Sequence, residues 1–443
     1  MSRVRFPSML RRVKIAIFLA LFAVVCVTAT VHAQVLTSPA GPTSPTSPTS
    51  PTRSGVLAFK VGKVVTMDAN DTIVNRAIVL VENGKITAVG KVGTIQIPAG
   101  ATVIDKPDLW LVPGAIDAHN HTGGSSSDLH DYVFLTNPGY RTLESVVSES
   151  DDLERARAGG ITSVLLIPGS GNNMSGFGTL LRTGGGTVEE AVIKPYGSVK
   201  VAQAGNPEGY FFGGRRTGRS FMNYNTRQTL EKAEAYHKAW NAFEEGESTE
   251  KPVLDPIFEG FRGLFDRKFV ASVHTQGYQL MMTTVDMLAR RLGIRTVLDH
   301  CTFDGYKVAR LVLEDESIRV INGPRQLQFD RTQRRIFGNA ARWWQGGIRR
   351  LGINTDAPVI PQEELPFQAT MACHFGWLPY QALKGITQVP AEALMLDDLG
   401  SIEVGKEASF VLWTGDPIDP RNSCIVTVIE GKIVYESEVQ RVF

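Results

Sequence analysis

Two histidines one residue apart close a short apolar stretch that reads LVPGAIDAHNH, residues 111–121. Side chains alternate between the two faces of a β-strand, so His119 and His121 are expected to point to the same side. Two imidazoles at the end of a buried strand can bind a divalent metal ion, for which Zn²⁺ is the expected choice. An isolated His-x-His pair is equally compatible with two polar residues in a loop, so a metal site requires further ligands.

Three later segments that read as short apolar strands each end on a candidate ligand. These segments are FVASVH, RTVLDH and LGINTD, at residues 269–274, 295–300 and 351–356. They close on His274, His300 and Asp356. A single histidine at a strand end is more often structural than a ligand. Four imidazoles and a carboxylate at one rim, however, predict a metal site.

Such a ligand set favours hydrolysis. A bound divalent cation lowers the pKa of its water from about 15.7 towards about 7, which makes hydroxide available near neutral pH. The attacked atom would be a carbonyl or amidine carbon. His300 is expected to act either as a metal ligand or as the group that polarises this carbonyl.

The elements that must position these residues alternate along the middle of the chain between strand-like and helix-like segments. Further strands are expected at residues 161–169, 198–203 and 318–323, and a charged helix at residues 226–246. This alternation is typical of a parallel α/β architecture. We therefore predict a (β/α)8 TIM-like barrel over residues 111–397, with its active site at the carboxyl ends of the strands.

Both ends of the folded part read as short strands between turns. Residues 56–110 contain three strand-like segments and a hairpin signal at Asn83-Gly84, and residues 398–443 contain two further hairpin-like stretches. The economical arrangement is a small composite β-sandwich formed by both chain ends, with the barrel inserted between them.

The first 55 residues predict export and a spacer. Residues 1–33 combine basic residues near the start, no acidic residue and a short apolar run, which indicates a secretory signal peptide cleaved before Gln34. An uncleaved membrane anchor is the alternative, although a span needs about 20 apolar residues. Residues 34–55 are rich in Pro, Ser and Thr and predict a solvated linker. We expect a periplasmic or extracellular protein with no stable membrane span after signal removal.

Charge and cysteine content argue against a nucleic-acid-binding protein and against a fold held by disulfides. The chain has 46 basic and 45 acidic residues, and no basic surface for nucleic acid is predicted. Outside the signal, Cys301, Cys373 and Cys424 are odd in number and widely spaced, which is not a disulfide framework. Cys301 follows His300 and is expected to face the helix layer, so we do not assign it as a nucleophile.

With these residues in place, the chain resembles the amidohydrolase superfamily, and within it the imidazolonepropionase-related amidohydrolases of broad substrate range. The matching motifs are VPGAIDAHNH, the three later ligands, PAEALML with GSIEVGKEASFVLW, and the middle segments ARAGGITSVLLIPGSGNNMSGFGTLLRT and VKVAQAGNPEGYFFGGRRTGRS. The resemblance implies that Asp356 takes a proton from the attacking water and passes it to the leaving nitrogen.

The resemblance leaves the number of metal ions open between one and two. Some superfamily members bridge two metals with a carboxylated lysine on the fourth strand, where Lys200 is expected. An ordinary lysine at a strand edge is the alternative for Lys200. One departure is Gly205, which replaces an acidic residue of the related group, so no role is carried over to that position.

Other conspicuous residues have plainer interpretations. Arg215, Arg216 and Arg219 form a cluster that would bind a substrate carboxylate or belong to a solvated loop. The Gly-rich segment 169–178 lacks the Gly-Lys-Ser/Thr ending of a P-loop and is expected to line the barrel mouth. Structural or surface positions are expected for His130, His237 and His374, and helix packing rather than a stacking platform for the Trp343-Trp344 pair.

The sequence therefore predicts an exported, metal-dependent amidohydrolase. It would hydrolyse a C–N bond in an amide, a cyclic amide or a peptide, with a small molecule or short peptide as substrate. A metal-dependent dipeptidase is the nearest alternative and a deaminase a weaker one. A non-catalytic binding protein on the same fold is the alternative from another class, and a homo-oligomer is left open.

Overall fold

The computed structural model describes residues 55–125, 134–208, 211–212 and 215–442. Residues 54–443 form one compact unit. The predicted signal peptide and nearly all of the predicted linker lie outside the described residues. Among the helices that are described, none combines the length and apolar character needed to cross a membrane.

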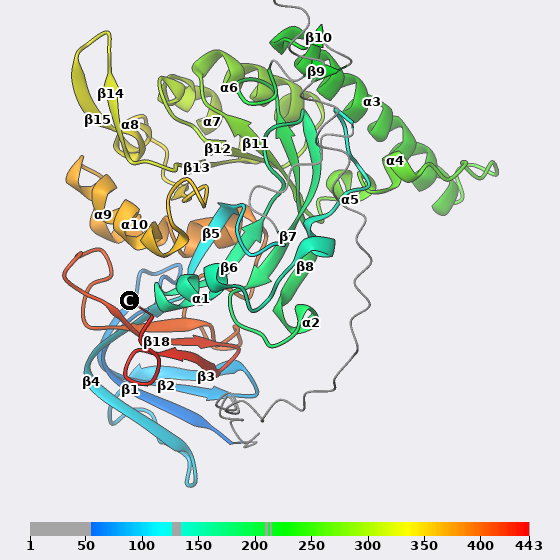
Figure 1. The fold of residues 1–443 in the computed structure, drawn as a ribbon. Coiled ribbons are helices and arrows are strands. Elements are labelled where there is room, and N and C mark those ends of the chain that lie inside the picture. Colours follow the sequence, from blue (N-terminus) through cyan, green and yellow to red (C-terminus); the bar gives the residue numbers. More distant parts are fainter. Residues whose placement is uncertain (1–54, 126–133, 209–210, 213–214, 443) are drawn as a thin grey trace, which may run out of the picture. The chain divides into compact units, whose positions relative to one another are not determined.

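An eight-stranded sheet in the order β16-β13-β12-β11-β8-β7-β6-β5 forms the centre of this unit (Figure 1). Its strands are β5 (Ala115–Asn120), β6 (Ile161–Leu166), β7 (Met174–Arg182), β8 (Val192–Ala202), β11 (Val270–Thr275), β12 (Thr296–His300), β13 (Ile318–Asn322) and β16 (Leu351–Ile353). A parallel bridge between Asn120 and Ala357 brings the two outer strands together. The sheet is therefore a nearly closed barrel of the TIM type, in a mixed α/β fold.

One barrel strand departs from the prediction. β7 pairs antiparallel with both β6 and β8, so the barrel is not entirely parallel. The expectation of a loop over residues 169–178 is wrong from Met174 onward, because residues 174–178 belong to β7. A short, glycine-containing buried strand lacks the periodicity that separates strands from loops in a sequence.

Helices pack against the outer face of the barrel. Buried residues of β6, β13 and β16 share one hydrophobic cluster with Trp343 and Leu365, which lie on two of these helices. Trp343 is thus a packing residue, as predicted. The helices are α1 (Asp151–Ala158), α2 (Val188–Ala191), α3 (Arg219–Glu244), α4 (Pro256–Glu259), α5 (Arg262–Phe265), α6 (Tyr278–Thr284), α7 (Ala309–Leu313), α8 (Asn339–Gln345), α9 (Leu365–His374), α10 (Pro379–Lys384) and α11 (Gln388–Ala393).

Both ends of the described chain contribute to a second sheet, in the order β19-β18-β17-β4-β1-β2-β3. Its strands are β1 (Leu57–Val65), β2 (Ile73–Glu82), β3 (Lys85–Lys91), β4 (Thr102–Pro113), β17 (Phe410–Trp413), β18 (Cys424–Ile429) and β19 (Lys432–Glu436). The sheet has a hydrophobic core of its own, in which the rings of Phe59 and Phe410 lie 4.9 Å apart. The seven strands form one hydrogen-bonded series, and the predicted sandwich of two sheets is not confirmed.

The stretch 111–121 is divided between the two sheets. β4 ends at Pro113 and β5 begins at Ala115, so these residues do not form one continuous strand. A Cβ atom at Gly114 would lie 2.1 Å from Oγ1 of Thr162, so only glycine fits at the crossing point. The short strand β5, rather than the whole apolar stretch, carries the first histidine of the pair.

Candidate active site

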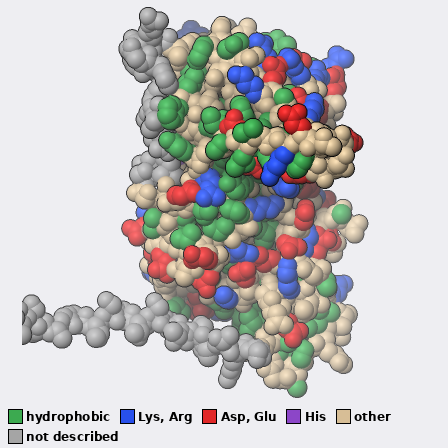
Figure 2. Space-filling model, turned by 90° about the vertical axis from the view of Figure 1, so that its right-hand side faces the viewer, with side chains coloured by type: hydrophobic (Ala, Val, Ile, Leu, Met, Phe, Trp, Pro, Cys, Tyr) green, Lys and Arg blue, Asp and Glu red, His purple; other side chains and the backbone are tan. Residues whose placement is uncertain are grey.

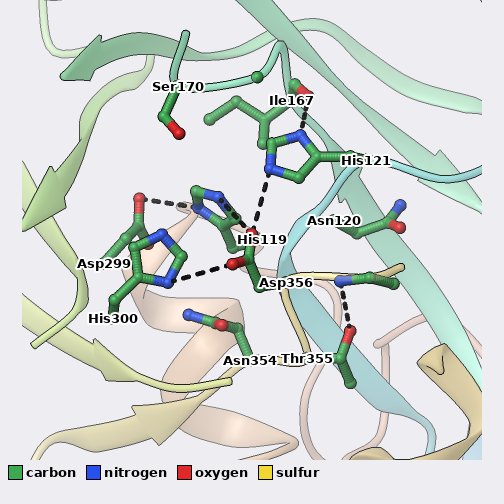
Figure 3. Close-up of polar contacts among 12 residues, drawn as sticks. His119, Asn120, His121, Ile167, Ser170, Asp299, His300, Asn354, Thr355 and Asp356 are labelled. Carbon is green, nitrogen blue, oxygen red and sulfur yellow. Dashed lines mark hydrogen bonds and ion pairs between the residues drawn. The ribbon is translucent and has the colours of Figure 1, made fainter. Parts of the chain in front are cut away.

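Six predicted site residues converge at the carboxyl ends of the barrel strands, and Figure 3 shows four of them, His119, His121, His300 and Asp356. They are His119 and His121 at the end of β5, Lys200 on β8, His274 on β11, His300 on β12 and Asp356 after β16. The lysine and the four histidines are buried, and the Asp356 side chain keeps 17% of its surface exposed. Residues separated by more than 200 positions in the chain therefore share one buried site.

Asp356 lies between three imidazoles (Figure 3). Its Oδ1 atom is 3.2 Å from Nε2 of His121 and 3.5 Å from Nε2 of His119. Its Oδ2 atom is 3.8 Å from Nδ1 of His300. His119, His300 and Asp356 each offer a ligand atom, and these atoms lie within 4.8 Å of one another. This spacing is compatible with a single metal ion bound between them.

Lys200 and His274 complete the cluster. Nζ of Lys200 is 2.9 Å from Nε2 of His119, and the rings of His274 and His300 have centroids 4.5 Å apart. Neither ring nitrogen of His274 or His300 has a hydrogen-bond partner among the described residues. Buried polar atoms are normally satisfied, so four buried, unsatisfied imidazole nitrogens are a donor set that fits a metal ion.

Burial sets the charges of this cluster. It lowers the pKa values of His119 and His274 well below the ordinary value, and the neighbouring cationic groups lower them further. It lowers the pKa of His300 to about 4. Burial alone would raise the pKa of Asp356, but His300, His121 and Lys200 outweigh it and hold that pKa below its usual range. Neutral imidazoles and an ionised carboxylate are the forms that bind metals.

The backbone turns two of these side chains into the site. His300 has φ +66° and Asp356 has φ +51°. Non-glycine residues seldom adopt this left-handed conformation, and such strain is concentrated at functional sites. At His300 this conformation ends β12, and Asp299 and His300 both contact His119, which strict alternation along a strand would not allow.

A second acidic side chain, Asp299, lies beside the histidines and was not predicted as a site residue. Oδ2 of Asp299 lies 3.0 Å from Nδ1 of His119, and the hydroxyl of Ser272 donates a hydrogen bond to Asp299. Burial raises the pKa of Asp299 to about 8. Its position directly before His300 in RTVLDH was the available signal, since a charged residue rarely lies inside a buried strand.

Asp117 contacts two of the segments that carry site residues. It is fully buried, accepts hydrogen bonds from the hydroxyl and the amide of Thr355, and lies 3.4 Å from the amide nitrogen of His119. Burial raises the pKa of Asp117 to about 7. The carboxyl group thereby connects β5, which carries His119, to the segment that carries Asp356.

The three arginines proposed to bind substrate, Arg215, Arg216 and Arg219, lie just before α3 and at its first residue. Arg219 is the first residue of α3 and is exposed, with its Nε atom 3.1 Å from Oε1 of Glu208. Glu208 also accepts a hydrogen bond from the amide of Gly205, at 2.9 Å. The backbone of Arg215 and Arg216 forms the short strand β10, which pairs with β9 (Phe211–Phe212). A substrate-binding role for the three arginines stays a prediction.

The remaining conspicuous residues lie away from the cluster. His237 is on α3, where it stacks on Phe265, and His374 ends α9. Cys301 is buried in the hydrophobic cluster between barrel and helices, as predicted. His130 lies outside the described residues.

Comparisons with known proteins agree with this architecture. A model of the amidohydrolase family matches residues 264–434. The amidohydrolase TasK of Hapsidospora irregularis is 23% identical over 407 residues, which cover 82% of this chain and 40% of that protein. The chain therefore spans less than half the length of TasK. Imidazolonepropionase of Pseudomonas entomophila is 25% identical over 370 residues, covering 77% of this chain and 88% of that enzyme.

A solved structure extends the similarity to the fold. The structure of an amidohydrolase from Thermotoga maritima superposes with a TM-score of 0.76 at 27% identity. It covers 86% of this chain, and all of that chain is matched. The similarity therefore extends over most of the chain.

Proposed function

Because the chain belongs to the amidohydrolase superfamily, we propose that it is an exported, metal-dependent hydrolase of a C–N bond in an amide, a cyclic amide or a peptide. The observation that carries this proposal is the buried cluster around Asp356, in which three imidazoles surround one ionised carboxylate. Hydrolysis of an unactivated amide requires an activated water and a group that shuttles its proton. The cluster contains residues of the types needed for both.

The donor set of this cluster fits a divalent metal ion. His119, His121, His274, His300 and Asp356 would hold it, and their nitrogen and oxygen donors favour Zn²⁺. When bound, the metal lowers the pKa of water and withdraws electrons from a substrate carbonyl. A second ion would involve Lys200 as a carboxylated bridge, and its contact with Nε2 of His119 supports that assignment.

The proton path follows from the charges of Asp356 and His300. Asp356 remains ionised, so its carboxylate can accept a proton as water adds to the carbonyl carbon. The same carboxyl group then donates that proton to the nitrogen as the C–N bond breaks. His300 is neutral above about pH 4 and, where it does not bind metal, its N–H would polarise the carbonyl oxygen. The products are a carboxylic acid and an amine, which remain joined in one ring-opened molecule when the substrate is a cyclic amide.

A substrate panel tests the reaction class. The purified full chain, supplied with Zn²⁺, is assayed for amine release from dipeptides, N-acyl amino acids and five- and six-membered cyclic amides, beside the Asp356→Asn variant. The proposal expects turnover of at least one class and loss of that turnover in the variant. Turnover confined to dipeptides would establish the dipeptidase alternative. Binding of these compounds without turnover in a folded, metal-loaded protein would contradict the hydrolase and favour the binding protein.

Capped dipeptides test the arginine cluster separately. If Arg215, Arg216 or Arg219 binds a substrate carboxylate, amidation of the C-terminus should raise KM. A KM that is the same for capped and free dipeptides would remove the three arginines from the proposed site.

Export is a further part of the proposal and rests on residues 1–33. Expression of the full chain in a Gram-negative host should deliver protein to the periplasm with an N-terminus at or near Gln34. Recovery of the protein with residues 1–33 attached in the membrane fraction would favour the anchor instead.

A further inference from the structure

A two-stranded hairpin extends from the barrel after β13 (Figure 1). It consists of β14 (Leu327–Asp330) and β15 (Arg335–Gly338), which belong to neither of the large sheets. One of its faces is anchored to the molecule. Phe337 lies against Tyr306 and the Arg342 guanidinium, and the side chain of Gln328 accepts a hydrogen bond from the amide of Phe303.

The opposite face of the hairpin is apolar and exposed. Phe329 and Ile336 are cross-strand neighbours that keep 54% and 57% of their surface exposed, and Leu327 on the same face is also exposed. An antiparallel ribbon with one solvated face normally carries polar residues there. Large apolar side chains side by side on an exposed face indicate a protein contact.

The hairpin is also basic. Its turn and second strand contain Arg331, Arg334 and Arg335, and no described residue forms an ion pair with them. The one acidic residue of the turn, Asp330, accepts hydrogen bonds from the amides of Thr332 and Gln333. The surface therefore requires a partner that is both apolar and acidic.

A surface of that kind exists on the same chain, on the side that carries the end of α3 and α4. Val253 is 87% exposed, and Leu254 and Ile257 are exposed beside it. The segment before them carries exposed carboxylates at Glu245, Glu247 and Glu250, for which the described chain offers no ion-pair partner. Figure 2 looks onto this side, where hydrophobic side chains lie among acidic and basic ones.

We propose that the hairpin of one copy, residues 327–338, binds the acidic segment of a second copy, residues 245–257. The hairpin presents Arg331 and Arg334 in its turn beside three exposed apolar residues, while Arg335 lies on its anchored face. The segment presents four acidic residues, one lysine and three exposed apolar residues. The two surfaces differ, so copies can join head to tail into a ring or a chain, or pair reciprocally across a two-fold axis. Charge complementarity of this kind accelerates association and selects the partner.

A charge swap tests the pairing. The basic hairpin is reversed in the triple variant Arg331→Glu, Arg334→Glu, Arg335→Glu, and the acidic segment in Glu245→Lys, Glu247→Lys, Glu250→Lys. These positions are exposed or in turns outside the active site, so folding and hydrolysis serve as controls. Sedimentation of the full chain at low ionic strength measures the mass of each protein and of an equal mixture.

The proposal expects wild-type protein to self-associate, each triple variant to be monomeric, and the mixture of the two variants to associate again. It also expects Phe329→Ser with Ile336→Ser to weaken self-association at least tenfold. A wild type that stays monomeric at about 100 µM, a concentration well above typical oligomer dissociation constants, would overturn it. Association that survives both charge reversals, or a monomer that instead sediments with anionic phospholipid vesicles through the hairpin, would overturn it as well.

Discussion

Asp299 and His119 touch through a buried carboxylate–imidazole contact, with Oδ2 of Asp299 3.0 Å from Nδ1 of His119 and no exposed surface on either side chain. The opposite ring nitrogen of His119, Nε2, points towards Lys200 and Asp356. A carboxylate behind a ligating imidazole fixes the orientation of the ring and strengthens its metal-binding nitrogen. Asp299 is therefore a positioning residue for the proposed metal site.

Replacing Asp299 should weaken metal binding without unfolding the protein. Asp299→Asn keeps the size of the side chain and replaces its carboxyl group with an amide, and we expect metal affinity to fall about 10- to 100-fold. Competition with a chromogenic chelator measures the affinity independently of turnover. Asp286→Asn, an exposed carboxylate on the helix that follows β11, is the matched control. Equal affinities in the two variants would remove Asp299 from this role.

Replacing Lys200 tests how many metal ions the site binds. In a two-metal site with a carboxylated lysine bridge, Lys200→Met should lower the metal content from about two equivalents per chain to about one. Lys194→Met is the control on the same strand, because Lys194 lies outside the cluster and donates a hydrogen bond to the carbonyl of Met395. Metal content of one equivalent in both wild type and Lys200→Met would establish a single-metal site.

Replacing Gly114 tests how closely the backbone is packed at the junction between the two sheets. Gly114→Ala places a Cβ atom 2.1 Å from Oγ1 of Thr162, so the backbones must separate. Overpacking of this kind costs about 1–3 kcal/mol of unfolding free energy, which urea denaturation can measure. Gly139→Ala is the control, since no atom lies within 4 Å of the added carbon. A loss no larger than that of the control would show that the junction is looser than described.

Cys424 should make the protein less stable at high pH. Burial raises the pKa of its thiol from 9.0 to about 12. Above about pH 9 the unfolded thiol loses its proton while the folded one keeps it. Stability therefore falls as pH rises between these two pKa values, by up to ~1.4 kcal/mol per pH unit.

Urea unfolding of wild type and Cys424→Ala at pH 8 and pH 10.5 separates this effect from the loss of packing. Loss of packing lowers the stability of the variant by a similar amount at both pH values. The account expects a steeper fall for the wild type between them. Parallel falls would show that the Cys424 thiol is not protected by the fold.

The candidate ligands were predictable because parallel strands bring their carboxyl ends to one rim. His119, His274, His300 and Asp356 each follow a short apolar segment, and that rule alone places them near one another. The resemblance to the superfamily placed Lys200 on the fourth strand, and β8, which carries it, is the fourth strand of the barrel. Local alternation does not give the left-handed backbone at His300 and Asp356, since it depends on how each strand ends in the folded barrel.

Contacts between segments that are far apart in the chain could not be predicted from the sequence. The partnership of Asp299 with His119 joins strands that are 180 positions apart, and no local pattern encodes it. β7 was missed because its Met174–Arg182 segment is buried and contains two glycines, which removes the alternation of an exposed strand. The steric limit at Gly114 could not be predicted either, because it comes from Thr162 on another strand.

The most direct test of the central claim is the metal content of the full chain, purified without chelator, beside its hydrolytic activity and that of Asp356→Asn. The account predicts one or two equivalents of bound divalent metal and an activity that disappears on chelation and returns with Zn²⁺. It predicts that Asp356→Asn stays folded and lacks this activity. A folded, metal-supplemented protein that binds no metal would contradict the account.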